Sequence, residues 1–209
     1  MNFKTEQEQF WMEEEWATSY MIRKGFDKIS IKPYENFFSR IIKDYYNIKS
    51  IVEFGANIGL NLVALKNLFP SVSLSAVEIN PKACEQLLNL GFINKIYNQS
   101  LLDLNIDQKS DLVLIKTVLI HINPNHLELV YKNIYETSNK YILIAEYYNP
   151  KPIEVEYRGH SNKLFKRDFA GEMLNMYNNL KLIDYGFAYH KDTNLEQDDI
   201  NWFLLEKIS

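Results

Sequence analysis

The sequence has 209 residues, the length of one ordinary domain, and its 46% hydrophobic and 24% charged residues are typical of a globular protein. The formal net charge of −4 argues against general binding to nucleic acid, and the single cysteine, Cys84, excludes a disulfide framework and a cysteine-rich zinc site. No apolar run approaches the roughly 18 residues of a membrane span, and the acidic start differs from the basic start of a signal peptide. We therefore expect a cytoplasmic protein with no membrane span and no nucleic-acid partner.

Two helices are predicted before the first strand. In the first 25 residues, Thr5 and Glu8 have the spacing of a capping box, and aromatic or apolar side chains then recur every four positions. A second helix is expected over 33–46, because a proline suits the first turn and an apolar stripe follows. We expect residues 1–48 to form a helical lid.

From residue 50 onward, short apolar segments alternate with helical ones. Strands are expected at 50–54, 72–79, 94–98, 111–116 and 141–146, with helices at 60–69, 81–90 and 124–139. This alternation predicts an α/β domain with a parallel sheet, occupying residues 49–209. The segments 180–190 and 201–207 are strand-like with no helix between them, which predicts an antiparallel pair at the end of the sheet.

A glycine-rich turn and a later acid carry the most functional information. Gly55 directly follows the first strand and Gly59 opens the next helix, so the backbone there can turn sharply and approach a ligand. Glu78 ends the second strand, where a doubly wound sheet places the carboxylate that accepts ribose hydroxyls. An ordinary strand-to-helix turn is the alternative for the glycines alone. Together, the turn and the acid predict a nucleoside-containing ligand.

The segment Glu53-Phe54-Gly55-Ala56-Asn57-Ile58-Gly59 resembles motif I of the class I S-adenosylmethionine-dependent methyltransferases, with Asn57 where a glycine is more common. It lacks the third glycine of a dinucleotide fingerprint, which argues against a nicotinamide-dependent sugar reductase. Together, segments 5–11, 54–61, 118–124 and 147–173 resemble the pseudaminic acid biosynthesis-associated methylases. The resemblance implies a Rossmann-like class I methyltransferase fold, with a mostly parallel seven-stranded sheet, an antiparallel last strand and N-terminal helices as a lid.

The resemblance also implies S-adenosylmethionine as cofactor. Its contacts would come from Tyr20, Arg23, Glu53, Gly55, Ala56, Asn57, Gly59, Asn61, Glu78, Ile79, Ser100, Leu101, Lys116 and Thr117. Glu53 would lie near the amino group, Glu78 at the ribose and Ile79 against the adenine. No acid stands directly after the third strand, so Gln99, Ser100 or a backbone carbonyl would take the adenine amino group. The four histidines lack metal-ligand spacing, and we expect no metal.

The acceptor site is expected near an acid-free basic run at 158–167, read as a loop between the fifth strand and the next helix. A solvated loop is the alternative. Arg158 suits a carboxylate or phosphate through two parallel hydrogen bonds. The expected substrate-binding residues are Tyr147, Tyr148, Arg158 and Lys166. A neutral hydroxyl acceptor would need a general base, for which the candidates are His121, Glu146 and His160, whereas an oxyanion would need none. His121 has a purely structural alternative.

These residues predict an S-adenosylmethionine-dependent methyltransferase that acts on an anionic small molecule. The resemblance implies an acidic sugar or a phosphorylated or phosphoramidate-type precursor in bacterial surface-glycan or capsule biosynthesis. Two alternatives stay open: a non-catalytic S-adenosylmethionine-binding accessory protein of a glycan pathway, and an N-methyltransferase of a peptide or amino-sugar.

Overall fold

The computed structural model describes residues 3–13, 30–43, 46–195 and 197–208. Tyr20, Arg23 and the second half of the predicted first helix lie outside these residues. Within the described part of the chain, no helix is long and apolar enough to cross a membrane.

The centre of the molecule is a twisted sheet whose strands, among the described residues, number seven and follow the order β3-β2-β1-β4-β5-β9-β8. They are β1 (Ser50–Phe54), β2 (Ser73–Glu78), β3 (Lys95–Asn98), β4 (Ser110–Lys116), β5 (Ser138–Glu146), β8 (Leu180–Ala188) and β9 (Ile200–Lys207). The pairs among β1 to β5 are parallel, and β9 runs antiparallel to both β5 and β8. The expected mostly parallel sheet with an antiparallel last strand is confirmed.

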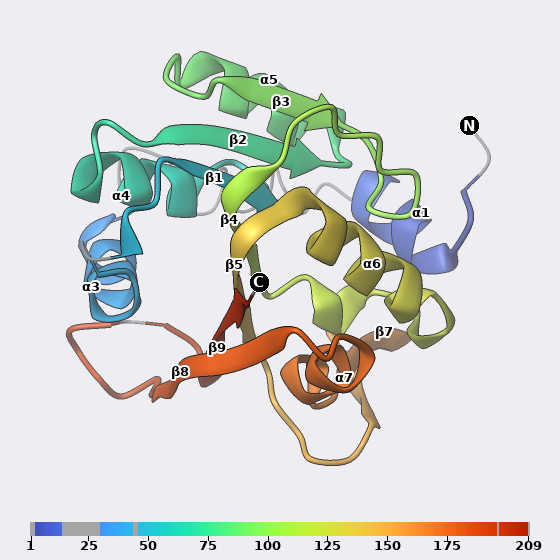
Figure 1. The fold of residues 1–209 in the computed structure, drawn as a ribbon. Helices are drawn as coiled ribbons and strands as arrows, with labels where there is room; N and C mark the ends of the chain where they lie inside the picture. Colours follow the sequence, from blue (N-terminus) through green and yellow to red (C-terminus); the bar gives the residue numbers. More distant parts are fainter. Residues whose placement is uncertain (1–2, 14–29, 44–45, 196, 209) are drawn as a thin grey trace.

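Helices cover both faces of this sheet (Figure 1). The described helices are α1 (Glu6–Glu13), α3 (Lys32–Ile41), α4 (Leu60–Leu68), α5 (Pro81–Asn89), α6 (Leu127–Thr137) and α7 (Phe169–Met176). Side chains of α3, α4 and α5 join one buried cluster, and those of α6 and α7 join the cluster on the opposite face. The middle of β4, residues 112–115, is apolar because its alternate residues, such as Leu114 and Ile115, enter the two clusters in turn.

Two helix bounds differ from the sequence expectation. The helix expected over 33–46 ends at Ile41, because Ile42 is extended, with φ −88° and ψ 116°. The helix expected from residue 124 begins as a short 3₁₀ turn and becomes α-helical only at Leu127; it ends at Thr137, and strand β5 follows at once.

The basic run at 158–167 is not a loop, and that expectation is wrong. Strands β6 (Ile153–Tyr157) and β7 (His160–Lys166) form an antiparallel hairpin outside the main sheet. Its turn is Arg158-Gly159, with φ values of 54° and 82°, as two-residue hairpin turns require. The hairpin forms because Leu164 and Phe165 are buried, so its charges stand on a strand that is anchored by apolar side chains.

Helix α3 packs into the body of the domain. Phe37, Phe38 and Ile41 are buried in the same cluster as α4 and the central strands. This helix therefore contributes to the core, although residues 1–48 are predicted to be a lid.

Replacing Phe38 tests this difference. Phe38→Ala should lower the free energy of unfolding by about 3–5 kcal/mol, because a fully buried phenylalanine is lost from the core. Chemical denaturation measures the change, and Ser39→Ala on the exposed side of the helix is the matched control. A loss below about 1 kcal/mol would mean that α3 is a detachable cap.

Candidate active site

A cavity of about 520 Å³ opens at the carboxyl ends of the parallel strands, where open α/β sheets bind their ligands. The loops after β1, β2, β3 and β4 form its floor, and α1, α3, the β6–β7 hairpin and the loop before β9 complete its walls. The carboxyl edge of the sheet thus faces a cavity bounded by segments from across the chain.

The glycine-rich loop after β1 is tied to the neighbouring strand. The amides of Gly55 and Ala56 donate to the carbonyl of Val77 at 2.8 and 3.1 Å. Gly55 and Asn57 have positive φ values of 74° and 48°, so the chain bends tightly toward the cavity, which both residues line. A Cβ on Gly55 would stand 2.5 Å from Cγ2 of Val118. Glycine is therefore required here by packing against Val118, not only by the approach of a ligand.

Gly59 has a different role from Gly55. It does not line the cavity, and a Cβ there would lie 2.7 Å from Leu87 and 2.8 Å from Leu90. Its φ of 88° also favours glycine. Gly59 therefore permits close packing between the start of α4 and the C-terminal end of α5.

Glu78 ends β2 and organises the loops on both sides of it. Its Oε2 accepts from the amide of Asn57 at 2.7 Å, and its Oε1 accepts from the amide of Asn80 at 2.8 Å. Burial raises the pKa of the carboxyl, whereas these backbone hydrogen bonds oppose the rise. Glu78 lines the cavity, and each oxygen keeps a second lone pair. It can therefore accept further hydrogen bonds from a ligand.

A buried charged cluster lies beneath the loop. Glu53 Oε1 accepts from Asn61 Nδ2 at 2.5 Å, while Glu53 Oε2 and Asn61 Oδ1 have no hydrogen-bond partner within the described residues. Burial raises the pKa of Glu53 to about 8, against the hydrogen bond from Asn61 and the nearby ammonium of Lys116. Lys116, which lines the cavity 5.6 Å from the ring centre of Tyr34, has a pKa lowered by burial. Two unpaired acceptor atoms thus stand close to the cavity.

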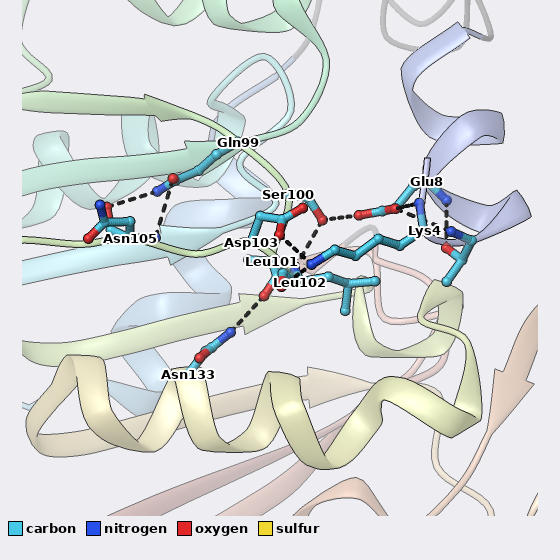
Figure 2. Close-up of polar contacts among 10 residues, drawn as sticks. Lys4, Glu8, Gln99, Ser100, Leu101, Leu102, Asp103, Asn105 and Asn133 are labelled. Carbon is cyan, nitrogen blue, oxygen red and sulfur yellow. Dashed lines mark hydrogen bonds and ion pairs between the residues drawn. The ribbon is translucent and has the colours of Figure 1, made fainter. Parts of the chain in front are cut away.

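At the far side of the loops, α1 meets the segment after β3 (Figure 2). Glu8 accepts a hydrogen bond from the Ser100 hydroxyl, and Lys4 forms an ion pair with Asp103. Lys4 Nζ also donates to the carbonyl of Leu102 at 3.2 Å. These contacts hold the first helix over the cavity edge that Ile79, Ser100 and Leu101 line.

The other end of the cavity is aromatic. The ring of His121 lies 4.6 Å from Trp11 and 5.0 Å from Tyr157, measured between centroids. His121 Nδ1 is 2.6 Å from the carbonyl of Lys163, so Nδ1 carries the proton in the neutral ring. Burial lowers the pKa of His121 to about 4. The ring is therefore neutral near pH 7, with the Nε2 lone pair unprotonated.

Donors complete this aromatic end. Arg158 lies over the face of Tyr157, 5.2 Å from the ring centre, and lines the cavity. Trp11 Nε1 is buried and has no hydrogen-bond partner in the described parts of the chain. Tyr147 also lines the cavity, and its hydroxyl donates to Asp198 at 2.7 Å. The aromatic end thus has a guanidinium on its wall, and its lining residue Trp11 has a buried indole N–H without a partner in the described residues.

Most of the residues predicted from the sequence meet around this cavity. Those that line it are Gly55, Ala56, Asn57, Asn61, Glu78, Ile79, Gln99, Ser100, Leu101, Lys116, Thr117, His121, Tyr147 and Arg158. Those that are described but do not line it are Glu53, Gly59, Glu146, Tyr148, His160 and Lys166.

The residues outside the cavity have other partners. Oε1 of Glu146 accepts from the amides of Val118 and Leu119 at 2.9 and 2.8 Å, which fixes the turn after β4, and burial raises the pKa of Glu146 to about 7. His160 is exposed with its ring against Phe10.

The basic run also separates into distinct environments. Lys163 forms an ion pair with Glu6 at 2.9 Å, and Arg167 pairs with Glu172 at 2.8 Å. Lys166 lies over the Tyr147 ring at 5.2 Å. Arg158 is the member of this run that reaches the cavity wall.

Several residues that line the cavity were not predicted from the sequence. They are Thr5, Gln7, Glu8, Tyr34, Asn80, Asn123, Tyr157, Gln197 and Asp198. The capping-box pattern identified Thr5 and Glu8 as helix-forming residues, but no local signal places that helix beside the sheet. In the described residues, no group of three or more His, Cys, Asp or Glu side chains is arranged to hold a metal ion.

Several solved structures with the same architecture are methyltransferases. An S-adenosylmethionine-dependent methyltransferase from Clostridium acetobutylicum ATCC 824 is 12% identical with a TM-score of 0.66, covering 93% of this chain and 98% of its own. Magnesium protoporphyrin IX methyltransferase from Synechocystis PCC 6803, solved with bound S-adenosylmethionine, is 12% identical with a TM-score of 0.67, and the match covers 100% of both chains.

A third neighbour was solved with a product of the cofactor. It is 1,6-didemethyltoxoflavin-N1-methyltransferase from Burkholderia thailandensis, bound to 1,6-didemethyltoxoflavin and S-adenosylhomocysteine. It is 13% identical with a TM-score of 0.68, covering 93% of this chain and 86% of its own. No protein-family model matches the sequence, and no curated protein sequence matches it. The strand order and these neighbours show that the chain has the Rossmann-like class I methyltransferase fold.

Proposed function

We propose that this protein is an S-adenosylmethionine-dependent methyltransferase. The observation that carries the proposal is Glu78, a buried carboxylate at the end of β2 that lines the cavity beside the glycine-rich loop. In this fold that position suits the two hydroxyls of a ribose. The neighbours solved with S-adenosylmethionine or S-adenosylhomocysteine support the same cofactor class.

The donor and acceptor chemistry of the cavity fits this cofactor. Glu53 Oε2 and Asn61 Oδ1 are buried acceptors without partners, which suits an amino group such as that of the methionine portion. Ile79 and Leu101 give apolar surfaces for the adenine. When bound, S-adenosylmethionine supplies a methyl group on a sulfonium, and the protein must align an acceptor with it.

The aromatic end of the cavity is our candidate acceptor site. His121 is the general base of the three candidates that the geometry favours, because it lines the cavity with Nε2 unprotonated. Glu146 and His160 do not line the cavity, and one oxygen of Glu146 is held by two backbone amides. Helix α1 excludes water from the cavity when it covers the edge.

We further propose that the acceptor is an anionic small molecule such as an acidic sugar or a phosphorylated precursor of a bacterial surface glycan. Arg158 offers a planar pair of donors, Trp11 offers an unpaired indole N–H, and Tyr147 and Tyr157 offer faces for a sugar ring. A non-catalytic binding protein or an N-methyltransferase of an amino-sugar or peptide would use the same cofactor end.

Transfer of labelled methyl groups separates these alternatives. The protein is incubated with methyl-labelled S-adenosylmethionine and a panel of acidic sugars, nucleotide sugars, sugar phosphates, amino-sugars and peptides. We expect the labelled methyl group on an anionic member of this panel. Label on amino-sugars or peptides alone would support N-methylation, and cofactor binding without transfer to any member would support the accessory role.

Removing the carboxylate of Glu78 should weaken S-adenosylhomocysteine binding at least ~10-fold. Charge-assisted hydrogen bonds to hydroxyls contribute roughly 1.5–3 kcal/mol each, and Glu78→Ala loses them together with the anchor of the loop. Titration calorimetry measures the dissociation constant, and thermal unfolding checks the fold. Glu85→Ala, on the exposed side of α5, is the control and should bind normally. Unchanged affinity in Glu78→Ala would remove this residue from the site.

The affinity for S-adenosylhomocysteine should rise with pH between 6 and 8. Glu53, with a pKa of about 8, is mostly protonated at pH 6, whereas an ammonium group favours the carboxylate. Binding therefore releases a proton, and the affinity should increase at least ~10-fold over this range. Calorimetry in two buffers of different ionisation enthalpy measures the release. Glu53→Gln keeps an oxygen for Asn61 and should flatten the profile; a flat wild-type profile would contradict the assignment.

Arg158→Lys should reduce the specificity constant for an anionic acceptor at least ~10-fold, about 1.4 kcal/mol, while the dissociation constant of S-adenosylhomocysteine stays the same. The lysine keeps the charge but loses the planar pair of donors. Rising salt should weaken acceptor binding more than cofactor binding. Lys151→Ala, an exposed basic residue before the hairpin, is the control. Wild-type rates in both Arg158→Lys and Arg158→Ala would refute the anionic acceptor.

A further inference from the structure

The carboxylate of Glu8 reaches across to the loop after β3, although the two lie 92 positions apart in the sequence. Figure 2 shows Glu8 of α1 pointing toward Ser100, and Glu8 Oε1 accepts a hydrogen bond from the Ser100 hydroxyl. Its other oxygen accepts from the amides of Lys4 and Thr5 at 2.7 and 3.3 Å, and Thr5 Oγ1 accepts from the amide of Glu8 at 3.1 Å. The predicted capping box is therefore formed, and it fixes the direction of this carboxylate.

Contacts on two sides hold α1 in this position. Lys4 binds the loop after β3 through Leu102 and Asp103. Gln7 is buried, and its Nε2 donates to the carbonyl of Asn162 in the hairpin at 2.8 Å. Asn80 Nδ2 donates to the carbonyl of Trp11 at 3.2 Å. Glu8 is thus held by the fold rather than placed by one surface contact.

The other polar side chains on this edge already have partners. Gln99, one of the alternatives expected at the adenine amino group, also lines the cavity, and it exchanges two hydrogen bonds of 3.3 Å with the backbone of Asn105 (Figure 2). The Ser100 hydroxyl donates to Glu8 and accepts from the amide of Leu102 at 3.0 Å. A carboxylate oxygen has two lone pairs, so Glu8 retains capacity to accept a further bond. Glu8 also lines the cavity beside Ile79 and Leu101.

We propose that Glu8 accepts a hydrogen bond from the 6-amino group of the cofactor's adenine. The inference rests on the proposed function. The segment after β3 has no acid of its own at 98–101, and the N-terminal helix supplies one from outside the sheet. Helix α1 then forms part of the cofactor site. Selectivity for adenine therefore depends on α1 being docked against the loop after β3.

Two ligands test the proposal by calorimetry: S-adenosylhomocysteine and its analogue in which hydrogen replaces the 6-amino group of the base. The wild type should bind the amino form at least ~10-fold more tightly, because loss of a hydrogen bond to a charged partner is costly. Glu8→Gln should reduce this preference at least ~3-fold, since a neutral amide oxygen is a weaker acceptor. Glutamine also serves in a capping box, so the helix is retained.

Glu6→Gln is the matched control. Glu6 stands in the same helical turn, pairs with Lys163 and does not line the cavity, so the preference should stay at the wild-type value. An unchanged preference in Glu8→Gln, including equal weakening of both ligands, would mean that Glu8 only supports the helix and would overturn the proposal. A wild type that binds both ligands equally would also overturn it. A wild type that binds neither ligand would instead refute the proposed function.

Discussion

The carboxylate of Glu78 joins the parts on which the candidate site depends. One oxygen holds the glycine-rich loop through the amide of Asn57, and the other holds the start of α5 through the amide of Asn80. Asn80 in turn caps α5 and donates to the carbonyl of Trp11. A single buried acid therefore connects the ends of β1 and β2 to helix α1. Because it also faces the cavity, a ligand that binds Glu78 meets groups that are already fixed in place.

Burial of charge is the main energetic cost of this arrangement. Glu53, near the end of β1, and Glu146, at the end of β5, have pKa values raised to about 8 and 7. Lys116 ends β4, the strand between them, and its pKa is lowered. One oxygen of Glu146 accepts from two backbone amides and one oxygen of Glu53 accepts from Asn61, while the second oxygen of each acid has no partner in the described residues. Such uncompensated groups occur where a ligand completes the hydrogen bonding.

The sequence predicted the parts of this protein that depend on local patterns. Continuous apolar strands, the turn at Gly55 and the acid at Glu78 are short-range signals, and the parallel strands and several residues on the floor of the cavity were predicted from them. For α1, the helix was predicted but its position was not. The capping box specifies a helix but not the contact of Glu8 with Ser100, 92 positions away. The β6–β7 hairpin was mistaken for a loop because its charges obscured the buried pair Leu164 and Phe165. Gln197 and Asp198 gave no signal at all, since only tertiary packing brings them to the cavity.

We propose that this cavity binds S-adenosylmethionine at the ends of β1 and β2. A crystal structure of the protein with S-adenosylhomocysteine tests it most directly. We expect the ribose hydroxyls on Glu78, the amino group at Glu53 and Asn61, and the sulfur directed toward the cavity end with His121 and Arg158. A complex in which the ligand occupies another surface, or lies in the cavity with its ribose away from Glu78, would contradict it.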